Sequence, residues 1–523
     1  MERNPLTLLD WSLIVLYLAG MVILGARFAR RQTTAEHYFT VNGTIPGWAA
    51  GMSMFATLLS SFVFIGFPGH TYMKNWEVLM QQFVTPLIIV GVALFIIPVY
   101  RRAVRISAYE YLERRFGYFA RAYGTIGFLI GHFTKIGIVM SATAVAWHGV
   151  TGWDRDTTLI VLGLMTVAYT YAGGMEAVIW TDVAQGFLML GSGFITLFFI
   201  LFVVTPEGPG ALWAEVMAAD KLELVNPAFS MTDQTVWVIV WMGLFHFTSR
   251  YATDQTMVQR YLTARSTWEA QKGAMVSIAA CMVMWISFSM IGTLLYGFYQ
   301  LHPERLAAEI TKGDQVFPYF IGRELPPGVV GLIMAGLFAA TMSTLSSDLN
   351  SFSACVVSDF YDRFNRGKSE RRRLLVSRVC VLITGIASVA LAAWIMRRPE
   401  GIMSFVLDAW ATIGAFLGGG ILAAFFLGFF CPRANWRGVN PALVIGALTV
   451  AWCYATMDGW IVLPEELALL TYRWHEWWLM GFSNILVFSL GYVLSRTLGP
   501  GETSDDILSA HHVEGVSPTP AAE

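Results

Sequence analysis

Long apolar segments recur along nearly the whole of this 523-residue chain, and they constrain its fold more than any other feature. A helix needs about 20 mostly apolar residues to cross the hydrocarbon core of a bilayer. By that measure we expect an all-α integral membrane protein with about 13 transmembrane helices. They are predicted near residues 8–28, 45–66, 77–100, 122–148, 157–172, 178–204, 234–252, 273–299, 328–357, 375–396, 403–430, 440–458 and 475–495.

The composition argues against several other classes of protein. Hydrophobic residues make up 56% of the chain, charged residues make up 13%, and the formal net charge is −2, so no nucleic-acid partner is expected. The cysteines are scattered, which indicates neither a zinc site nor a disulfide framework. The sequence has no P-loop, no strand-embedded GxGxxG and no evident nucleophile–base or metal constellation. We therefore expect no cofactor and no enzymatic activity.

The distribution of Lys and Arg predicts the orientation in the membrane. Basic residues follow the first, third, seventh and ninth predicted helices, whereas the alternate loops, such as 205–233 and 302–325, are poorer in them. Because cytoplasmic loops carry the excess of Lys and Arg, the N-terminus is expected outside and the C-terminus in the cytoplasm of a plasma or inner membrane. Residues 499–523 have no apolar periodicity and are expected to be a disordered tail.

The second predicted helix carries small and hydroxylated residues at mid-membrane, in the sequence FATLLSSF of residues 55–62. Such a sequence suits an unwound segment, in which freed backbone carbonyls can bind a cation. The alternative is that small residues allow close helix packing.

The ninth predicted helix is rich in hydroxyl groups between Thr341 and Ser347. At about 3.6 residues per turn, Ala340, Ser343, Thr344 and Ser347 share one helix face. Sodium is a hard cation, and hydroxyls with carbonyls supply oxygen ligands without burying many formal charges. The alternative is that these hydroxyls bond back to the preceding turn.

Charged residues at membrane depth are costly and usually functional. Asp182 begins a long apolar run and is either a functional acid or a helix cap at the interface. Lys135 lies mid-helix with no acid one helical turn away, so it needs an anionic ligand or an ion-pair partner, for which Asp408 is the candidate. His246 lies in an aromatic helix, where a packed core role is the alternative to a functional one.

Three stretches, in this order, resemble the sodium:solute symporter family, which includes sodium/sialic-acid and sodium/glucose symporters. They are TYAGGMEAVIWTD (170–182), ATDQTMVQRYLTA (252–264) and AxxSTxSS from Ala340. The resemblance covers roughly residues 5–495 and implies a leucine-transporter-type fold with two inverted five-helix repeats. The implied parts are an extra N-terminal helix and loop (1–44), a core (45–430) with repeats 45–204 and 234–430, and two C-terminal helices (431–498). Helices 45–66 and 234–252 would be broken around the solute.

The resemblance also implies site residues. A common sodium site would use the carbonyls of Ala56, Leu59 and Ala340 and the hydroxyls of Ser343 and Thr344. A second sodium site, found in the sialic-acid branch, would use Asp182, Ser343, Ser346 and Ser347. The candidate solute contacts are Ser60, Gln82, Lys135, His246, Phe247 and Asp408.

The implied function is sodium-coupled import of a small organic solute by alternating access. Lys135 occupies the position of a carboxylate-binding arginine, which favours an acidic solute such as a carboxylate or a sialic-acid-like sugar acid. Leu58, Val63 and Val78 replace two threonines and a phenylalanine, which favours a smaller or less hydroxylated acid. A neutral sugar, polyol or amino acid is the alternative solute. A channel would not need paired cation sites, and only about 25 residues follow the last helix, too few for a sensor's signalling domain.

Overall fold

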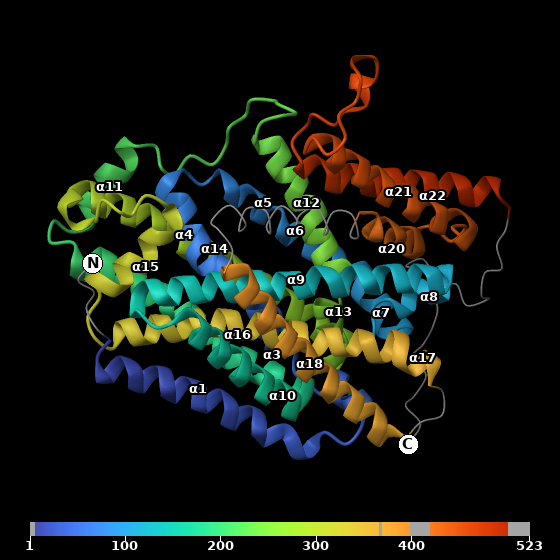
Figure 1. Cartoon of the computed structure of the whole chain (residues 1–523), viewed down its shortest axis with the longest axis horizontal. Helices are drawn as coiled ribbons and strands as arrows, with labels where there is room; N and C mark the ends of the chain where they lie inside the picture. Colours follow the sequence, from blue (N-terminus) through green and yellow to red (C-terminus); the bar gives the residue numbers. More distant parts are fainter. Residues whose placement is uncertain (1–5, 366–368, 398–418, 500–523) are drawn as a thin grey trace.

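A computed structural model of the chain describes residues 6–365, 369–397 and 419–499 (Figure 1). Within these ranges every regular element is a helix. Nine helical stretches are long and apolar enough to cross a membrane, and one bent pair of helices adds a tenth. The all-α membrane fold is therefore confirmed. The number of about 13 spans is not, partly because most of the predicted helix 403–430 lies outside the described residues.

The long helices fall close to their predicted positions, and several short helices join them. The longer elements are α1 (Leu8–Phe28), α3 (Gly47–Leu58), α4 (Ser61–Met73), α9 (Tyr118–Thr151), α10 (Arg155–Phe199), α12 (Val236–Ala252), α14 (Thr267–Leu301), α16 (Val329–Cys355), α18 (Glu370–Met396), α21 (Trp436–Met457) and α22 (Trp477–Thr497). The shorter ones are α2 (Ala35–Thr40), α5 (Met80–Phe83), α6 (Thr85–Gly91), α7 (Ile97–Ala103), α8 (Glu110–Phe116), α11 (Pro209–Ala218), α13 (Gln255–Thr263), α15 (Gly313–Glu324), α17 (Asp362–Phe364) and α20 (Ile421–Phe430). The span predicted at 77–100 runs from Glu77 to Ala103 through α5, α6 and α7.

The interruption predicted in the second helix is confirmed. Helices α3 and α4 meet at an angle of 60°. Leu59 between them has extended backbone angles (φ −96°, ψ 109°). Ser60 then caps α4, because its Oγ accepts a hydrogen bond from the Phe62 amide at 3.3 Å.

The second broken helix is interrupted later than expected. The sequence predicted a break within 234–252, but α12 continues to Ala252 and the chain leaves the helix at Thr253. Asp254 then starts α13, because its Oδ1 accepts from the Thr256 amide at 2.8 Å. An aspartate satisfies free amides at a helix start and so fixes the break at this residue.

Gly174 joins the two helices predicted at 157–172 and 178–204 through a sharp kink inside α10. Its φ of 56° lies in the region that side-chain-bearing residues rarely adopt. A Cβ at Gly174 would also lie 2.7 Å from the backbone oxygen of Tyr38. The kink therefore needs glycine for its backbone angles and for the space beside α2.

Helix α16 lies at the centre of the molecule, and in Figure 1 it runs between α9 and α1. Every residue from Ile333 to Ser351 is buried. Its amino end is fixed by α1, where Asp10 Oδ1 accepts from the amides of Gly328 and Gly331 at 2.7 and 2.8 Å. The hydroxyl-rich segment is therefore held inside a tightly packed core.

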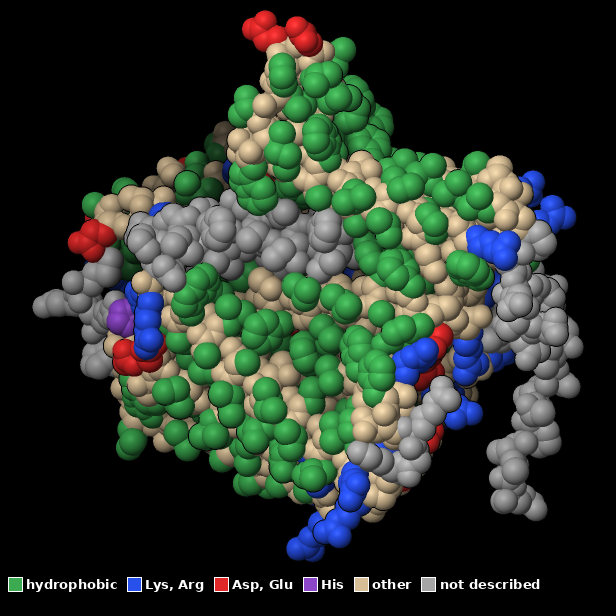
Figure 2. Space-filling view, turned by 45° about the vertical axis from the view of Figure 1, so that its right-hand side comes forward, with side chains coloured by type: hydrophobic (Ala, Val, Ile, Leu, Met, Phe, Trp, Pro, Cys, Tyr) green, Lys and Arg blue, Asp and Glu red, His purple; other side chains and the backbone are tan. Residues whose placement is uncertain are grey.

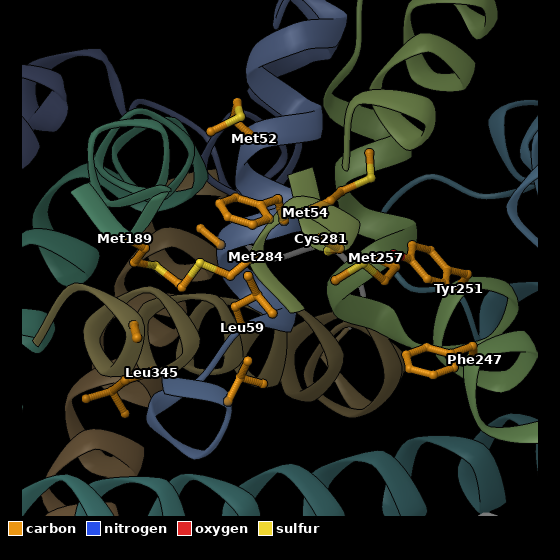
Figure 3. Packing of buried hydrophobic residues seen from close by; sticks show 14 of the residues in the cluster. Met52, Met54, Leu59, Met189, Phe247, Tyr251, Met257, Cys281, Met284 and Leu345 are labelled. Carbon is orange, nitrogen blue, oxygen red and sulfur yellow. The ribbon is translucent and has the colours of Figure 1, made fainter. Parts of the chain in front are cut away.

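Hydrophobic packing surrounds the break between α3 and α4. Figure 3 shows Leu59 near Met189 of α10 and Met284 of α14, with Met54 of α3 further along its own helix. On the outside, hydrophobic side chains cover most of the described surface in Figure 2, and Lys and Arg gather towards its right and lower edges. This distribution is typical of a protein whose sides face lipid.

The predicted disordered tail lies outside the described residues, except for Gly499.

Candidate functional site

The residues predicted to form the common sodium site meet at the α3–α4 break. Ser343 Oγ donates to the carbonyl oxygens of Ala56 (2.9 Å) and Ala340 (3.2 Å). Thr344 Oγ1 donates to the Ala340 oxygen at 3.0 Å. Leu59, the fifth predicted member, is fully buried at the break itself. Because a hydroxyl hydrogen can rotate away, these oxygens can also turn lone pairs towards a cation, and their role as ligands stays a prediction.

The predicted second sodium site centres on a fully buried carboxylate. Asp182 is 0% exposed, so the alternative of an interfacial helix cap is wrong. Its Oδ2 accepts from Ser53 Oγ (2.6 Å) and from Ser347 Oγ (3.4 Å). Its Oδ1 has no hydrogen-bond partner in the described part of the chain. Ser346 Oγ donates to the Ser343 carbonyl at 3.2 Å within α16, and among the predicted serines of this site only Ser347 forms a hydrogen bond with Asp182 in the described part of the chain.

Arg260 was missed by the sequence analysis. Its Nη2 lies 3.0 Å from Asp182 Oδ2, its Nε donates to Ser53 at 2.8 Å, and the side chain is 0% exposed. The sequence placed Arg260 in a loop after the seventh helix, although it belongs to one of the three stretches that carried the family resemblance. The guanidinium neutralises Asp182 inside the core.

Lys135 has an acidic partner that the sequence analysis did not identify. Its Nζ lies 2.8 Å from Asp348 Oδ2 and 2.9 Å from Oδ1. Of the two alternatives that the sequence left open for Lys135, the structure shows an ion-pair partner, and the partner is Asp348. Asp348 lies on α16, directly after Ser347. Asp408, the partner proposed from sequence, lies outside the described residues.

The Lys135–Asp348 pair belongs to a larger group of buried charges, which we name the charge cluster: Lys135, Asp348, His132, Asp254 and Arg250. His132 bridges the two acids, with Nδ1 at 2.8 Å from Asp348 Oδ1 and Nε2 at 3.0 Å from Asp254 Oδ2. Arg250 forms an ion pair with Asp254. The cluster thus joins α9 and α16 to the break between α12 and α13, and ionisable groups at such a depth usually serve function.

The other described candidate solute residues lie on different elements, and His246 is near the cluster, because it interacts electrostatically with Arg250 and Asp254. Gln82 is buried on α5, and its Oε1 has no hydrogen-bond partner within the described ranges. Helix α5 packs closely on α12, which carries His246 and Phe247. The Phe247 ring lies 5.6 Å from that of Trp285, and the His246 ring lies 5.2 Å from that of Phe247. His246 is also one helical turn before Arg250.

Ser60 is half-buried at the start of α4. The next residue, Ser61, donates to the Val139 carbonyl at 3.2 Å, one turn beyond Lys135 on α9. The start of α4 therefore packs against α9. Lys135 is connected to Arg250 through the charge cluster. In the described part of the chain no hydrogen bond joins Ser60 or Gln82 directly to Lys135.

The structure has two interrupted helices. Carbonyls and hydroxyls meet at one break, and buried charges lie between the two breaks. These features define a secondary transporter of the leucine-transporter type. A model of the sodium:solute symporter family matches residues 38–446. The chain belongs to the sodium:solute symporter family.

Several relatives agree with this assignment. A sodium/sialic acid symporter of Proteus mirabilis is 32% identical over 86% of this chain and 90% of its own length. A sodium/sialic acid symporter of Aliivibrio fischeri is 33% identical over 88% of this chain and 90% of its own length. The human sodium/iodide cotransporter is 30% identical over 80% of this chain and 65% of its own length.

A solved structure of a Na⁺-coupled sialic acid symporter in a substrate-bound, outward-open state has the same fold. It superposes with a TM-score of 0.86 at 30% identity and covers 95% of this chain and 100% of its own. That structure contains a novel Na⁺ site. The chain is therefore a multi-pass membrane protein that couples transport of a small solute to sodium.

Proposed function

We propose that this symporter imports an acidic solute that carries a carboxylate, with a sialic-acid-like sugar acid as the first candidate. The observation that carries the proposal is Lys135, a cation deep in the membrane that is 17% exposed as a side chain, while its partner Asp348 is 0% exposed. An ammonium has three donors, so contact with one carboxylate leaves capacity for a second. The two relatives that align over 90% of their own length, at 32% and 33% identity, are both sialic acid symporters.

A less hydroxylated acid is the second candidate solute. The resemblance to the sialic-acid branch places Leu58 and Val63 where that branch has threonines. Val63 is buried and Leu58 is half-buried next to the break. Apolar side chains at these positions cannot donate to sugar hydroxyls, which favours a solute with fewer of them.

Two sodium ions would accompany each solute. The meeting of Ser343 and Thr344 with the Ala56 carbonyl supports the common site. Asp182 Oδ1 has no hydrogen-bond partner among the described residues, which supports the second site, since a buried carboxylate oxygen normally has a partner. Both sites share α16.

The remaining parts of the proposal concern topology. The core would comprise residues 45–430 as two inverted repeats, flanked by the extra helix (1–44) and by two C-terminal helices (431–498). The N-terminus would lie outside a plasma or inner membrane and the C-terminus in the cytoplasm, since basic residues follow α1, α7 and α17. The protein would transport its solute without covalent chemistry.

Sodium-driven uptake into proteoliposomes tests the solute. Radiolabelled sialic acid should accumulate against its gradient only when sodium is higher outside. Lys135→Ala should abolish this uptake, and Lys135→Arg should keep part of it, because a guanidinium also binds a carboxylate. Uptake that is unchanged in Lys135→Ala, or that occurs without sodium, would refute the proposal.

A further inference from the structure

The charge cluster carries an inference that rests on the proposed function and goes beyond it. His132 is held between two carboxylates, and both ring nitrogens lie within hydrogen-bond distance of an acid oxygen. An ionised carboxylate only accepts hydrogen bonds, whereas a neutral imidazole has one donor and one acceptor. Two donated bonds therefore require a proton on each ring nitrogen.

Cationic groups also approach the ring, but less closely. Lys135 Nζ lies 3.3 Å from Nδ1, compared with 2.8 Å for the Asp348 oxygen. Arg250 Nη1 lies 3.3 Å from Nε2, compared with 3.0 Å for the Asp254 oxygen. On each nitrogen the acid is the nearer partner, which favours the imidazolium form.

With His132 charged, the cluster holds three cations (Lys135, His132, Arg250) and two anions (Asp348, Asp254). The formal charges of these five residues sum to one positive charge. A buried excess charge is costly unless an opposite charge joins it. The neighbouring Arg260 adds nothing to this sum, because Asp182 neutralises it at 3.0 Å.

The exposed fractions show which charges a solute can reach. The side chains of Lys135 and Arg250 are 17% and 15% exposed, that of Asp254 is 10% exposed, and that of Asp348 is 0% exposed. The two cations are therefore the most exposed members of the cluster, and the Asp348 carboxylate is the least exposed. A single carboxylate entering here would bring the cluster to neutrality.

Other ionisable groups pack around His132 and Asp254. The neighbours on α12 and α13 are His246 and Arg260, and the Phe128 ring lies 4.1 Å from that of His132. Phenols and a thiol also face Asp254: Tyr100, Tyr109, Tyr261 and Cys355. Phenols and thiols titrate well above neutral pH, so His132 and His246 are the groups that need to be separated by experiment.

We propose that His132 and Asp348 set the charge of the transported solute. Together they leave one positive charge beside Lys135 without an opposite charge among the described residues, so that the site accepts a solute with a single negative charge and rejects its neutral analogue. Sodium ions add the same charge whichever solute is bound, so they do not alter this selection.

The charge of His132 can be tested without a solute. Histidines labelled with ¹⁵N in the purified, detergent-solubilised protein report whether each ring carries one proton or two. A doubly protonated signal at pH 7 that is absent from His132→Gln is expected. A neutral His132 ring at pH 7 would overturn the proposal, even if sodium-driven acid uptake is established.

Binding of matched acids and amides tests the selection itself. Sialic acid, lactate and nicotinate are compared with their primary amides by competition in saturating sodium. The wild type should prefer the acid of a bound pair by at least about tenfold, as expected for one charge at this depth. Because an imidazolium loses its charge at high pH, a preference that depends on one should fall as pH rises. In His132→Gln the preference should fall by at least about tenfold and become independent of pH.

A matched control is His148→Gln, which changes a histidine on the same helix whose Nδ1 lies 2.7 Å from the Trp153 carbonyl in the α9–α10 loop. It should keep the wild-type preference and its pH dependence. Equal binding of acid and amide by the wild type, or pH dependence lost in His246→Gln and kept in His132→Gln, would overturn the proposal. If His132→Gln does not fold, the wild-type preference and its pH profile still decide. If no acid is taken up with sodium, the proposed function fails, and the ¹⁵N signal decides the charge of the cluster separately.

Discussion

Asp182→Asn removes the charge that faces the buried guanidinium of Arg260, 3.0 Å away. Both side chains are 0% exposed, so water cannot replace the lost partner. Removing one member of a buried ion pair costs about 3–5 kcal/mol, because the other charge stays buried and uncompensated. We expect a lower unfolding temperature for the purified protein in detergent, and a folding equilibrium constant lower by roughly 100-fold or more.

The double variant Asp182→Asn/Arg260→Gln separates the ion pair from other effects. It removes both charges and keeps groups of similar size that can still form hydrogen bonds. Replacing both members of a buried pair is often close to neutral, so we expect it to regain most of the lost stability. A single variant as stable as the wild type, or a double variant no more stable than the single one, would refute the reasoning.

The same double variant tests the second sodium site. If Asp182 is also a sodium ligand, restoring stability will not restore its charge. Sodium dependence of uptake should then lose cooperativity, with a Hill coefficient that falls from about two towards about one. A wild-type coefficient of about one, with charge movement for a single sodium, would remove the second site.

Three further substitutions test other parts of the structure. Ser343→Ala/Thr344→Ala should abolish sodium-driven uptake while the protein still inserts. The control Thr166→Ala, which removes a buried hydroxyl elsewhere, should keep this uptake. Unchanged sodium dependence in the double variant would contradict the common site. Gly174→Ala should destabilise the protein by about 1–3 kcal/mol in thermal unfolding, because its φ is 56°, and a stable variant would contradict a strained kink. Burial raises the pKa of Glu113, but hydrogen bonds and charges of two arginines outweigh it and hold the pKa below its ordinary value. Glu113→Gln should therefore lower stability at pH 7 and lose this effect as pH falls through the lowered pKa, where the wild-type carboxyl also takes up a proton; an equal loss at low pH would contradict the ion pairs.

Features caused by neighbouring residues could be predicted from the sequence. The small and hydroxylated residues at 55–62 predicted the interruption at Leu59, and the glycine pair before Met175 separated two predicted helices where Gly174 bends the chain. The common sodium site was predicted through the family resemblance, and the structure brings four of its five groups into direct contact.

Features that depend on distant residues could not be predicted in this way. Lys135 and Asp348 are 213 positions apart, so a search one helical turn from Lys135 could not find the pair. The acid was visible, because Asp348 lies inside a predicted span where a carboxylate is costly. Arg260 looked like part of a basic loop, because nothing local indicates that α13 folds back into the core.

The contact of α1 with the amino end of α16 has a practical consequence. Asp10 is itself held by Thr7, whose Oγ1 donates to Asp10 Oδ2 at 2.6 Å, and it supplies the acceptor for the Gly328 and Gly331 amides. Affinity tags or fluorescent proteins joined ahead of Thr7 leave this arrangement intact. A chain shortened into α1 would instead leave the two amides without their acceptor at the edge of the bilayer, at the start of the helix that carries the hydroxyls.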